Sequence, residues 1–233
     1  MPLMTPILLV PGLGCSARLF GPQLPALWQL GPVTVANHTT ADSMAGIAQS
    51  ILAHAPPRFH LVGLSMGGYI SFEILRQAPE RVAKLALLDT AARADTPEQT
   101  ARREKLIAIA REGRLQLVNE ALWPLLVHES RAKDRELRAV VDAMLSEVGA
   151  AAFIRQQEAL IGRPDSRPAL GAVRSATLVI VGDGDRLTPP ELNAEIAAGI
   201  AGARLETIAQ CGHLSTLERP DAVNKLLFDW ISA

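Results

Sequence analysis

The chain has 233 residues, of which 48% are hydrophobic and 20% are charged, and its formal net charge is −1. These values are typical of a single globular domain with room for an insertion, and such a chain buries roughly 70–75% of the surface that it exposes when unfolded. Because the charge is nearly balanced and no basic run is present, we do not expect nucleic acid or an anionic membrane as a partner.

The N-terminus and the two cysteines bear on location. The first six residues contain no basic segment and no long apolar core, so they do not resemble a signal peptide. The longest apolar runs are too short to span a bilayer. Cys15 and Cys211 are too few for a disulfide framework, and their spacing does not suggest a metal site. We therefore expect a soluble, cytoplasmic protein with reduced thiols.

The chain opens with two predicted strands and a helix. The apolar run Ile7–Val10 is rich in β-formers and stops at Pro11 and Gly12, which break regular structure. Residues 33–36 form a second apolar run. Residues 41–55 predict a helix with Asp42 or Ser43 as its N-cap.

A strand, a tight turn and a helix are predicted around Ser65. The strand covers residues 59–62, the turn reads Gly-Leu-Ser-Met-Gly over residues 63–67, and the helix covers residues 67–77. The glycines leave space for a sharp turn that exposes the serine hydroxyl, and the helix N-terminus offers amides to an anion. This pattern indicates a nucleophile elbow. Such a match arises by chance in roughly one chain in ten of this length. The choice between a nucleophile elbow and an ordinary turn therefore depends on whether a base and an acid for Ser65 are also present.

The next predicted strand, residues 85–88, is followed by a long helical segment. Four amphipathic helices are expected over residues 98–112, 115–127, 134–148 and 150–161, with no convincing strand among them. We interpret residues 96–162 as a helical cap inserted into the fold and lying over the active edge. The alternative is a second small domain without a catalytic role.

Strands and helices alternate again after the cap. The strands are predicted over residues 178–181 and Arg204–Ile208, and the helices over residues 191–200 and 221–231, with Pro220 at the start of the last one. Apolar strands alternating with helices predict an α/β fold with a doubly wound, mainly parallel sheet. Its core is expected to comprise residues 1–95 and 163–233, with the ligand beyond the carboxyl ends of the strands.

A serine nucleophile needs a base within hydrogen-bond reach, and the base needs an orienting acid. After this kind of elbow the chain order is serine, acid, histidine. His213 lies in the short loop between the final strand and the final helix, so we expect it to be the base for Ser65. Asp185 is the expected acid, Asp183 a turn residue that bonds backbone amides, and Asp89 the alternative acid.

The tetrahedral oxyanion of an ester reaction also needs donors. We expect the backbone N–H groups of Met66, which follows the nucleophile, and of Leu13, in the loop after the first strand. Metal ligands and cofactors are not expected.

Four residues are candidates for the substrate pocket: Cys15, His38, Trp123 and Leu126. His38 follows a strand at the active edge, although a solvated turn explains it equally well. Trp123 and Leu126 lie in an apolar stretch of the cap, which forms either the roof of an acyl pocket or the core of the cap itself.

Together these motifs resemble the α/β-hydrolase superfamily over nearly the whole chain, and small esterases and enol-lactonases with a short cap most of all. The resemblance rests on motifs at the oxyanion loop, the elbow, the stretch after the elbow helix, the acid loop and the histidine loop: residues 11–14, 63–68, 78–89, 182–189 and 212–220. The sequence departs from the usual motifs of this superfamily at three places. Pro11 replaces the usual histidine, residues 37–40 replace the usual Asp-x-x-Gly-x-Gly-x-Ser segment, and the leading antiparallel hairpin is missing, which should expose a sheet edge.

The resemblance implies a serine hydrolase acting on a small to medium, largely apolar carboxylic ester or lactone through an acyl-enzyme, as a monomer or homodimer. One alternative uses the same catalytic residues for C–C bond, thioester or perhydrolase chemistry. Another is a receptor-like protein that binds its ligand and turns it over slowly.

Overall fold

The computed structural model describes residues 4–233, in which six strands form one sheet of order β2-β1-β3-β4-β5-β6. Every strand pairing in this part of the chain is parallel, so the predicted doubly wound α/β fold is confirmed, and no antiparallel hairpin precedes β1 within it. The strands are β1 Ile7–Val10, β2 Val33–Val35, β3 Phe59–Leu64, β4 Val82–Leu88, β5 Ala176–Gly182 and β6 Arg204–Ile208.

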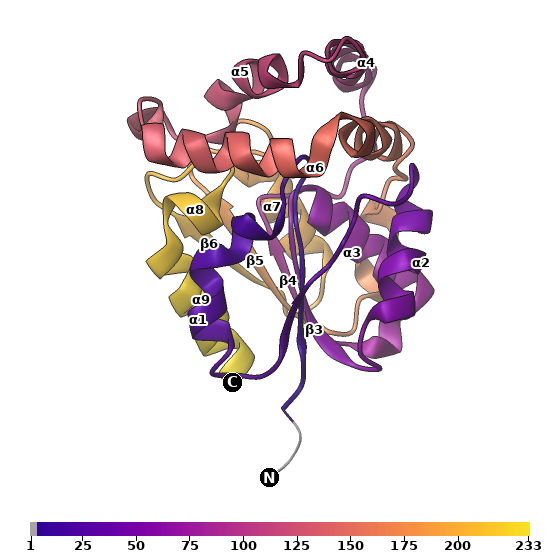
Figure 1. The fold of residues 1–233 in the computed structure, drawn as a ribbon. Coiled ribbons are helices and arrows are strands. Elements are labelled where there is room, and N and C mark those ends of the chain that lie inside the picture. Colours follow the sequence, from indigo (N-terminus) through magenta and orange to yellow (C-terminus); the bar gives the residue numbers. More distant parts are fainter. Residues whose placement is uncertain (1–3) are drawn as a thin grey trace.

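Helices cover both faces of the sheet. On one face lie α1 and α9, and on the other α2, α3 and α7 (Figure 1). These five helices, with the short α8 of the histidine loop, are α1 Leu24–Leu27, α2 Met44–His54, α3 Met66–Gln77, α7 Pro190–Gly199, α8 Ser215–Glu218 and α9 Pro220–Ser232. Ser43 caps α2, as one of the two expected residues, by accepting a hydrogen bond from the Gly46 amide.

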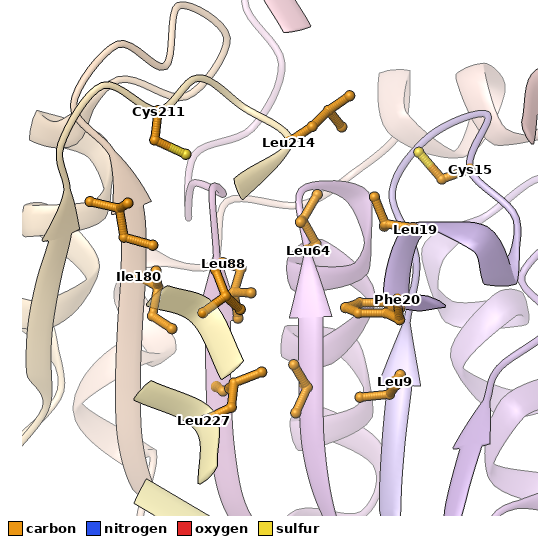
Figure 2. Packing of buried hydrophobic residues seen from close by; sticks show 14 of the residues in the cluster. Leu9, Cys15, Leu19, Phe20, Leu64, Leu88, Ile180, Cys211, Leu214 and Leu227 are labelled. Atoms are coloured by element: carbon orange, nitrogen blue, oxygen red, sulfur yellow. The ribbon is translucent and has the colours of Figure 1, made fainter. Parts of the chain in front are cut away.

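Two apolar cores lie against the two faces because successive side chains of a strand point to opposite sides. Figure 2 shows Leu9, Leu64, Leu88 and Ile180, from four neighbouring strands, in a row against Leu227 of α9. The strands β1, β3, β4 and β5 are mostly buried on both faces, which explains their continuous apolar runs. The edge strands β2 and β6 are partly exposed.

The cap contains only helices, and they lie over the carboxyl ends of the strands (Figure 1). They are α4 Pro97–Arg111, α5 Leu115–Leu126 and α6 Arg135–Ile161. The last two predicted cap helices are the halves of α6, which breaks at Gly149, where φ is 76°. Glycine suits this break because a left-handed backbone costs it little. Leu106, Val118 and Phe153 belong to an apolar cluster within the cap.

Short helical turns complete the structure and were not expected from the sequence. Four of them are 3₁₀ helices: Ala17–Gln23, Pro79–Arg81, Glu129–Arg131 and Arg167–Ala172. Three of them contain proline close to their start or inside, which breaks the periodicity that marks longer helices.

Candidate active site

Ser65 lies at the turn between β3 and α3 with a φ of 54° and a ψ of −113°. A positive φ is strained for a residue with a side chain and persists only where the surroundings hold it. Here the Ser65 amide donates a 2.9 Å hydrogen bond to the Leu88 carbonyl, and the Thr90 hydroxyl donates a 2.8 Å bond to the Ser65 carbonyl. The end of β4 therefore fixes the turn.

The glycines of the elbow let three backbone segments meet. A side chain at Gly63 would overlap with the Gly67 carbonyl, and one at Gly67 would overlap with the Val10 carbonyl at the end of β1. Gly68 is equally close to Thr90. The motif therefore places the start of α3 directly against the loop that follows β1.

Replacing Gly67 with alanine is expected to destabilise the protein by about 3 kcal/mol or more, because the methyl group can be placed only by moving backbone. Gly171→Ala is the matched control, since a side chain at Gly171 meets no atom within 4 Å. Urea denaturation of both variants measures the difference. Equal stability of the two would mean that α3 does not approach β1 this closely.

The side chains of Ser65, His213 and Asp185 form a chain of hydrogen bonds. The Ser65 hydroxyl lies 2.8 Å from Nε2 of His213, and Nδ1 of His213 lies 2.8 Å from Oδ2 of Asp185. Because a carboxylate only accepts, the imidazole proton lies on Nδ1, which leaves Nε2 to accept the hydroxyl proton of Ser65. The three residues come from the loops after β3, β5 and β6, as the sequence predicts.

The electrostatics of this chain favour a basic imidazole. Burial lowers the pKa of His213, but the charge and hydrogen bond of Asp185, with the charges of Asp89 and Glu218, together raise that pKa above its usual value. Burial alone raises the pKa of Asp185, but the charge of His213 and the hydrogen bonds to the carboxylate lower that pKa overall. Asp185 is thus ionised where His213 needs it.

The Asp185 carboxylate is held by its own loop. Oδ1 accepts from the amides of Leu187 and Thr188 at 2.8 and 3.0 Å, and Oδ2 accepts from the Thr188 hydroxyl at 2.7 Å. The amide of His213 donates to the Leu126 carbonyl at the end of α5, at 3.1 Å. The cap is thereby bonded to the loop that carries the base.

Asp183 and Asp89, the other two aspartates considered in the sequence, form no hydrogen bond with His213. Asp183 accepts from the Cys211 amide at 3.2 Å, as expected of a turn residue. Asp89, the alternative acid, accepts from the Gly182 amide at 2.9 Å and from the Ser215 hydroxyl. Burial and the charge of Asp185 raise the pKa of Asp89 to about 8. Asp89 is therefore a structural link between β4, β5 and α8, and not the hydrogen-bond partner of His213.

The loop after β1 lies beside Ser65. A Cβ added to Gly12 would lie 3.5 Å from the Ser65 Cβ. The Gly14 amide donates to Oε1 of Gln156 in α6 at 3.0 Å, which ties this loop to the cap. Within residues 4–233 the N–H groups of Leu13 and Met66, the two predicted oxyanion donors, have no hydrogen-bond acceptor. Both amides are thus available to an oxyanion formed at Ser65.

Comparison with known proteins places this geometry in a family. Residues 10–220 match the family model described as the alpha/beta hydrolase fold. The chain belongs to the α/β-hydrolase family. A 2-hydroxy-6-oxononadienedioate/2-hydroxy-6-oxononatrienedioate hydrolase of Escherichia coli is 28% identical over 88% of this chain and 73% of its own.

Solved structures of similar proteins have the same fold. A thermophilic esterase from Thermogutta terrifontis, solved with malate bound, is 27% identical with a TM-score of 0.90, over 99% of this α/β-hydrolase and 90% of the esterase. The enol-lactonase from Burkholderia xenovorans LB400 has a TM-score of 0.87 at 24% identity, over 98% and 92% of the two chains, and so shows the shared fold.

His38 has a different role from the one expected. It is buried behind the oxyanion loop of this α/β-hydrolase, where its Nε2 lies 2.9 Å from the Gly12 carbonyl, and it does not line the pocket. The prediction that His38 borders the substrate is therefore wrong. The loop after β1 thus has a histidine contact from the loop that follows β2.

Protonation of His38 is expected to destabilise the fold in acid. Burial lowers the pKa of His38 to about 4, below its usual 6.5, so the unfolded chain binds a proton there more readily than the native one. The stabilising contribution is complete above pH 6.5 and is lost as the pH falls towards 4. We expect a loss of about 2 kcal/mol from this group between pH 7.5 and pH 5.

Urea denaturation of the wild type and of His38→Gln at these two pH values measures that contribution. The glutamine amide retains a donor for Gly12 but does not titrate, so the variant should lose less stability in acid. The pKa of His60 is also lowered to about 4, by burial first and by Lys84 and Arg58, but His60 is present in both proteins. The same pH dependence in both would contradict the assignment.

A pocket with an empty volume of about 940 Å³, its mouth included, lies between Ser65 and the cap. Cys15 and Leu126 line it, as predicted. Most of the cap residues that line it are apolar, and they are Leu106, Val118, Leu122, Leu126, Val141, Met144, Leu145, Phe153 and Leu160.

Trp123 does not line this pocket. Its indole N–H donates to the Ala132 carbonyl at 2.9 Å, and its ring packs in the apolar core with Arg138 over one face. The prediction of a pocket tryptophan is wrong, because these contacts hold the ring in the core, away from the pocket lined by Leu122 and Leu126. The apolar stretch of α5 therefore forms both the roof of the pocket and part of the core.

The two cysteines are free, as expected, and both are buried. Figure 2 shows them apart along the same edge of the sheet, with Leu64 of β3 and Leu88 of β4 between them. Burial raises the pKa of the Cys15 thiol to about 12, so this pocket residue is a neutral, apolar contact at physiological pH.

Two further findings concern residues 4–233. No group of three or more His, Cys, Asp or Glu side chains is arranged to hold a metal ion there. No helix in this part of the chain combines the length and the apolar character needed to cross a membrane.

Proposed function

We propose that this α/β-hydrolase is a serine hydrolase that cleaves a small to medium carboxylic ester or lactone through an acyl-enzyme. The observation that carries the proposal is the hydrogen-bonded chain of Ser65, His213 and Asp185 at the floor of the pocket. Residues 96–162 act as its cap. The free, buried thiols fit a reducing compartment, so we propose a cytoplasmic enzyme, active as a monomer or homodimer.

In the proposed reaction, the Ser65 oxygen attacks the ester carbonyl carbon and His213 takes the serine proton at Nε2. Asp185 stabilises the resulting imidazolium. The amides of Leu13 and Met66 donate to the oxyanion, and removal of one such donor typically costs about 3–4 kcal/mol of transition-state stabilisation. When the tetrahedral intermediate collapses, the C–O bond to the alcohol breaks and the alcohol takes the proton from His213.

Water then completes the cycle. His213 removes a proton from the water as it attacks the acyl carbon, and the bond to Ser65 breaks with return of the proton to the serine oxygen. The apolar cap residues above Ser65 support an apolar acyl chain, and backbone bonds from His213 and Gly14 to the cap keep the pocket closed around it.

A panel of substrates tests the proposal. We expect steady-state turnover of p-nitrophenyl esters or lactones by the wild type. Hydrolysis of acyl-thioesters or of a vinylogous diketone alone, with no oxygen ester cleaved, would instead favour thioester or C–C bond chemistry. Tight ligand binding with negligible kcat on every substrate would favour the receptor-like alternative.

A further inference from the structure

Part of the pocket lining is polar and carries positive charge. Arg102 and Arg103 of α4 line the pocket, as does Gln157 of α6. Among the described residues that line the pocket there is no aspartate or glutamate, so these two guanidinium groups are its only permanent charges. The pocket therefore combines a mostly apolar lining with two cationic groups.

Gln157 presents a hydrogen-bond donor that has no acceptor in the protein. Its side chain is fully buried, and its Oε1 accepts from Nη1 of Arg103 at 2.9 Å. Because an arginine can only donate, this bond fixes which end of the amide is oxygen. The Nε2 group is buried and has no partner within residues 4–233. A buried donor left unpaired is unfavourable, so this group needs an acceptor from within the pocket, which a water or a ligand can supply.

Arg103 is held in place for such a ligand. Its Nε donates to both carboxylate oxygens of Asp95, at 3.1 and 3.0 Å. Asp95 also pairs with the buried Arg163, so a single carboxylate serves two guanidinium groups. The local charge thus remains positive even after these ion pairs are counted.

Arg102 adds a second cation at the mouth. It is exposed, and within residues 4–233 it makes no ion pair and no side-chain hydrogen bond. An arginine fork suits a carboxylate, to which it can donate two parallel bonds. Its neighbour Lys105 on the same helix does not line the pocket and offers a matched comparison.

We propose that Arg102, Arg103 and Gln157 bind a carboxylate of the substrate, so that the preferred substrate is an ester or lactone with a second, free carboxylate at the far end of its acyl chain. This inference rests on the proposed function and names its substrate class. The apolar lining holds the methylene chain, and the ester carbonyl lies at Ser65.

The test compares two substrates that differ only at the chain end. Mono-p-nitrophenyl adipate ends in a carboxylate, and p-nitrophenyl hexanoate has the same acyl length and ends in a methyl group. For the wild type we expect kcat/KM to be at least roughly tenfold higher for the adipate ester, as a charge-assisted hydrogen bond would give. Equal values, or a preference for hexanoate, would overturn the inference.

Variants assign the preference to the subsite. Arg102→Gln should lower kcat/KM for the adipate ester by roughly tenfold and leave the hexanoate ester nearly unchanged. Gln157→Glu, which places a carboxylate beside Arg103, should abolish the preference through like-charge repulsion. Lys105→Gln removes the same charge from α4 outside the pocket and should change neither substrate. Equal effects of Arg102→Gln and Lys105→Gln would mean that the overall positive charge of α4, and not a carboxylate site in the pocket, causes the preference.

Binding of adipate itself separates this inference from the proposed function. If the enzyme cleaves the hexanoate ester and shows no preference for the adipate ester, only the inferred substrate class is wrong. If it cleaves no ester, the proposed function is wrong, and calorimetry still tests the subsite. Adipate binding that is lost in Arg102→Gln would support the subsite, and no adipate binding by the wild type would overturn it.

Discussion

Ser65→Ala is expected to lower kcat for ester hydrolysis by about a million-fold, because the acyl-enzyme cannot form and only binding and the oxyanion donors remain. The variant should fold normally, since the Ser65 side chain makes its one hydrogen bond to His213 and alanine meets the same backbone strain. Steady-state kinetics with p-nitrophenyl hexanoate and urea denaturation measure the two effects.

Ser71→Ala is the matched control for that loss. Ser71 lies in α3, the helix that follows Ser65. Its hydroxyl donates to the Gly67 carbonyl at 2.7 Å, and it does not line the pocket. Its replacement should cost about 1 kcal/mol of stability and leave kcat nearly unchanged. Substantial hydrolysis by Ser65→Ala, after correction for contaminating esterase, would mean that another group is the nucleophile.

Asp185→Asn is expected to lower kcat by about 10,000-fold, because a neutral amide neither stabilises the imidazolium nor favours the tautomer that leaves Nε2 free. Asp89→Asn should retain activity within about tenfold, since Asp89 binds Gly182 and Ser215 and an amide can satisfy both of them. Steady-state kinetics of the pair decide between the two acids. Loss of activity in Asp89→Asn alone would reverse the assignment.

The pH profile gives a second readout of the same pair. His213 must be neutral to accept the serine proton, so activity is lost as the pH falls through the pKa of His213. Asp185 raises that pKa above 6.5 in the wild type. The acid limb of kcat/KM should therefore shift to lower pH in the residual activity of Asp185→Asn, which a purely structural role of Asp185 would not produce.

The sequence predicts the positions of Ser65, Asp185 and His213 because each lies in a loop that follows a predicted parallel strand, and the carboxyl ends of parallel strands meet at one edge of the sheet. The apolar runs of β1, β3, β4 and β5 are long enough to identify these strands. Helical spacing explains why Leu122 and Leu126 share one side of α5, but it does not exclude Trp123, which lies three residues before Leu126. The place of Trp123 in the core depends on its contacts with Ala132 and Arg138, which the spacing does not show.

The residues that the sequence does not predict depend on packing between distant segments. Nothing near His38 in the sequence indicates that its ring contacts Gly12, because the contact requires the register between β1 and β2. Likewise, Arg103 and Gln157 meet only because α4 and α6 pack against each other. Two adjacent arginines on a helix are otherwise typical of a solvated surface.

Covalent labelling with a fluorophosphonate identifies the nucleophile directly. We expect one phosphonyl group per chain, carried by the peptide that contains Ser65, with complete loss of esterase activity and no labelling of Ser65→Ala. Labelling should also be much slower in Asp185→Asn. A label on another residue, or full activity after complete labelling of Ser65, would contradict the account.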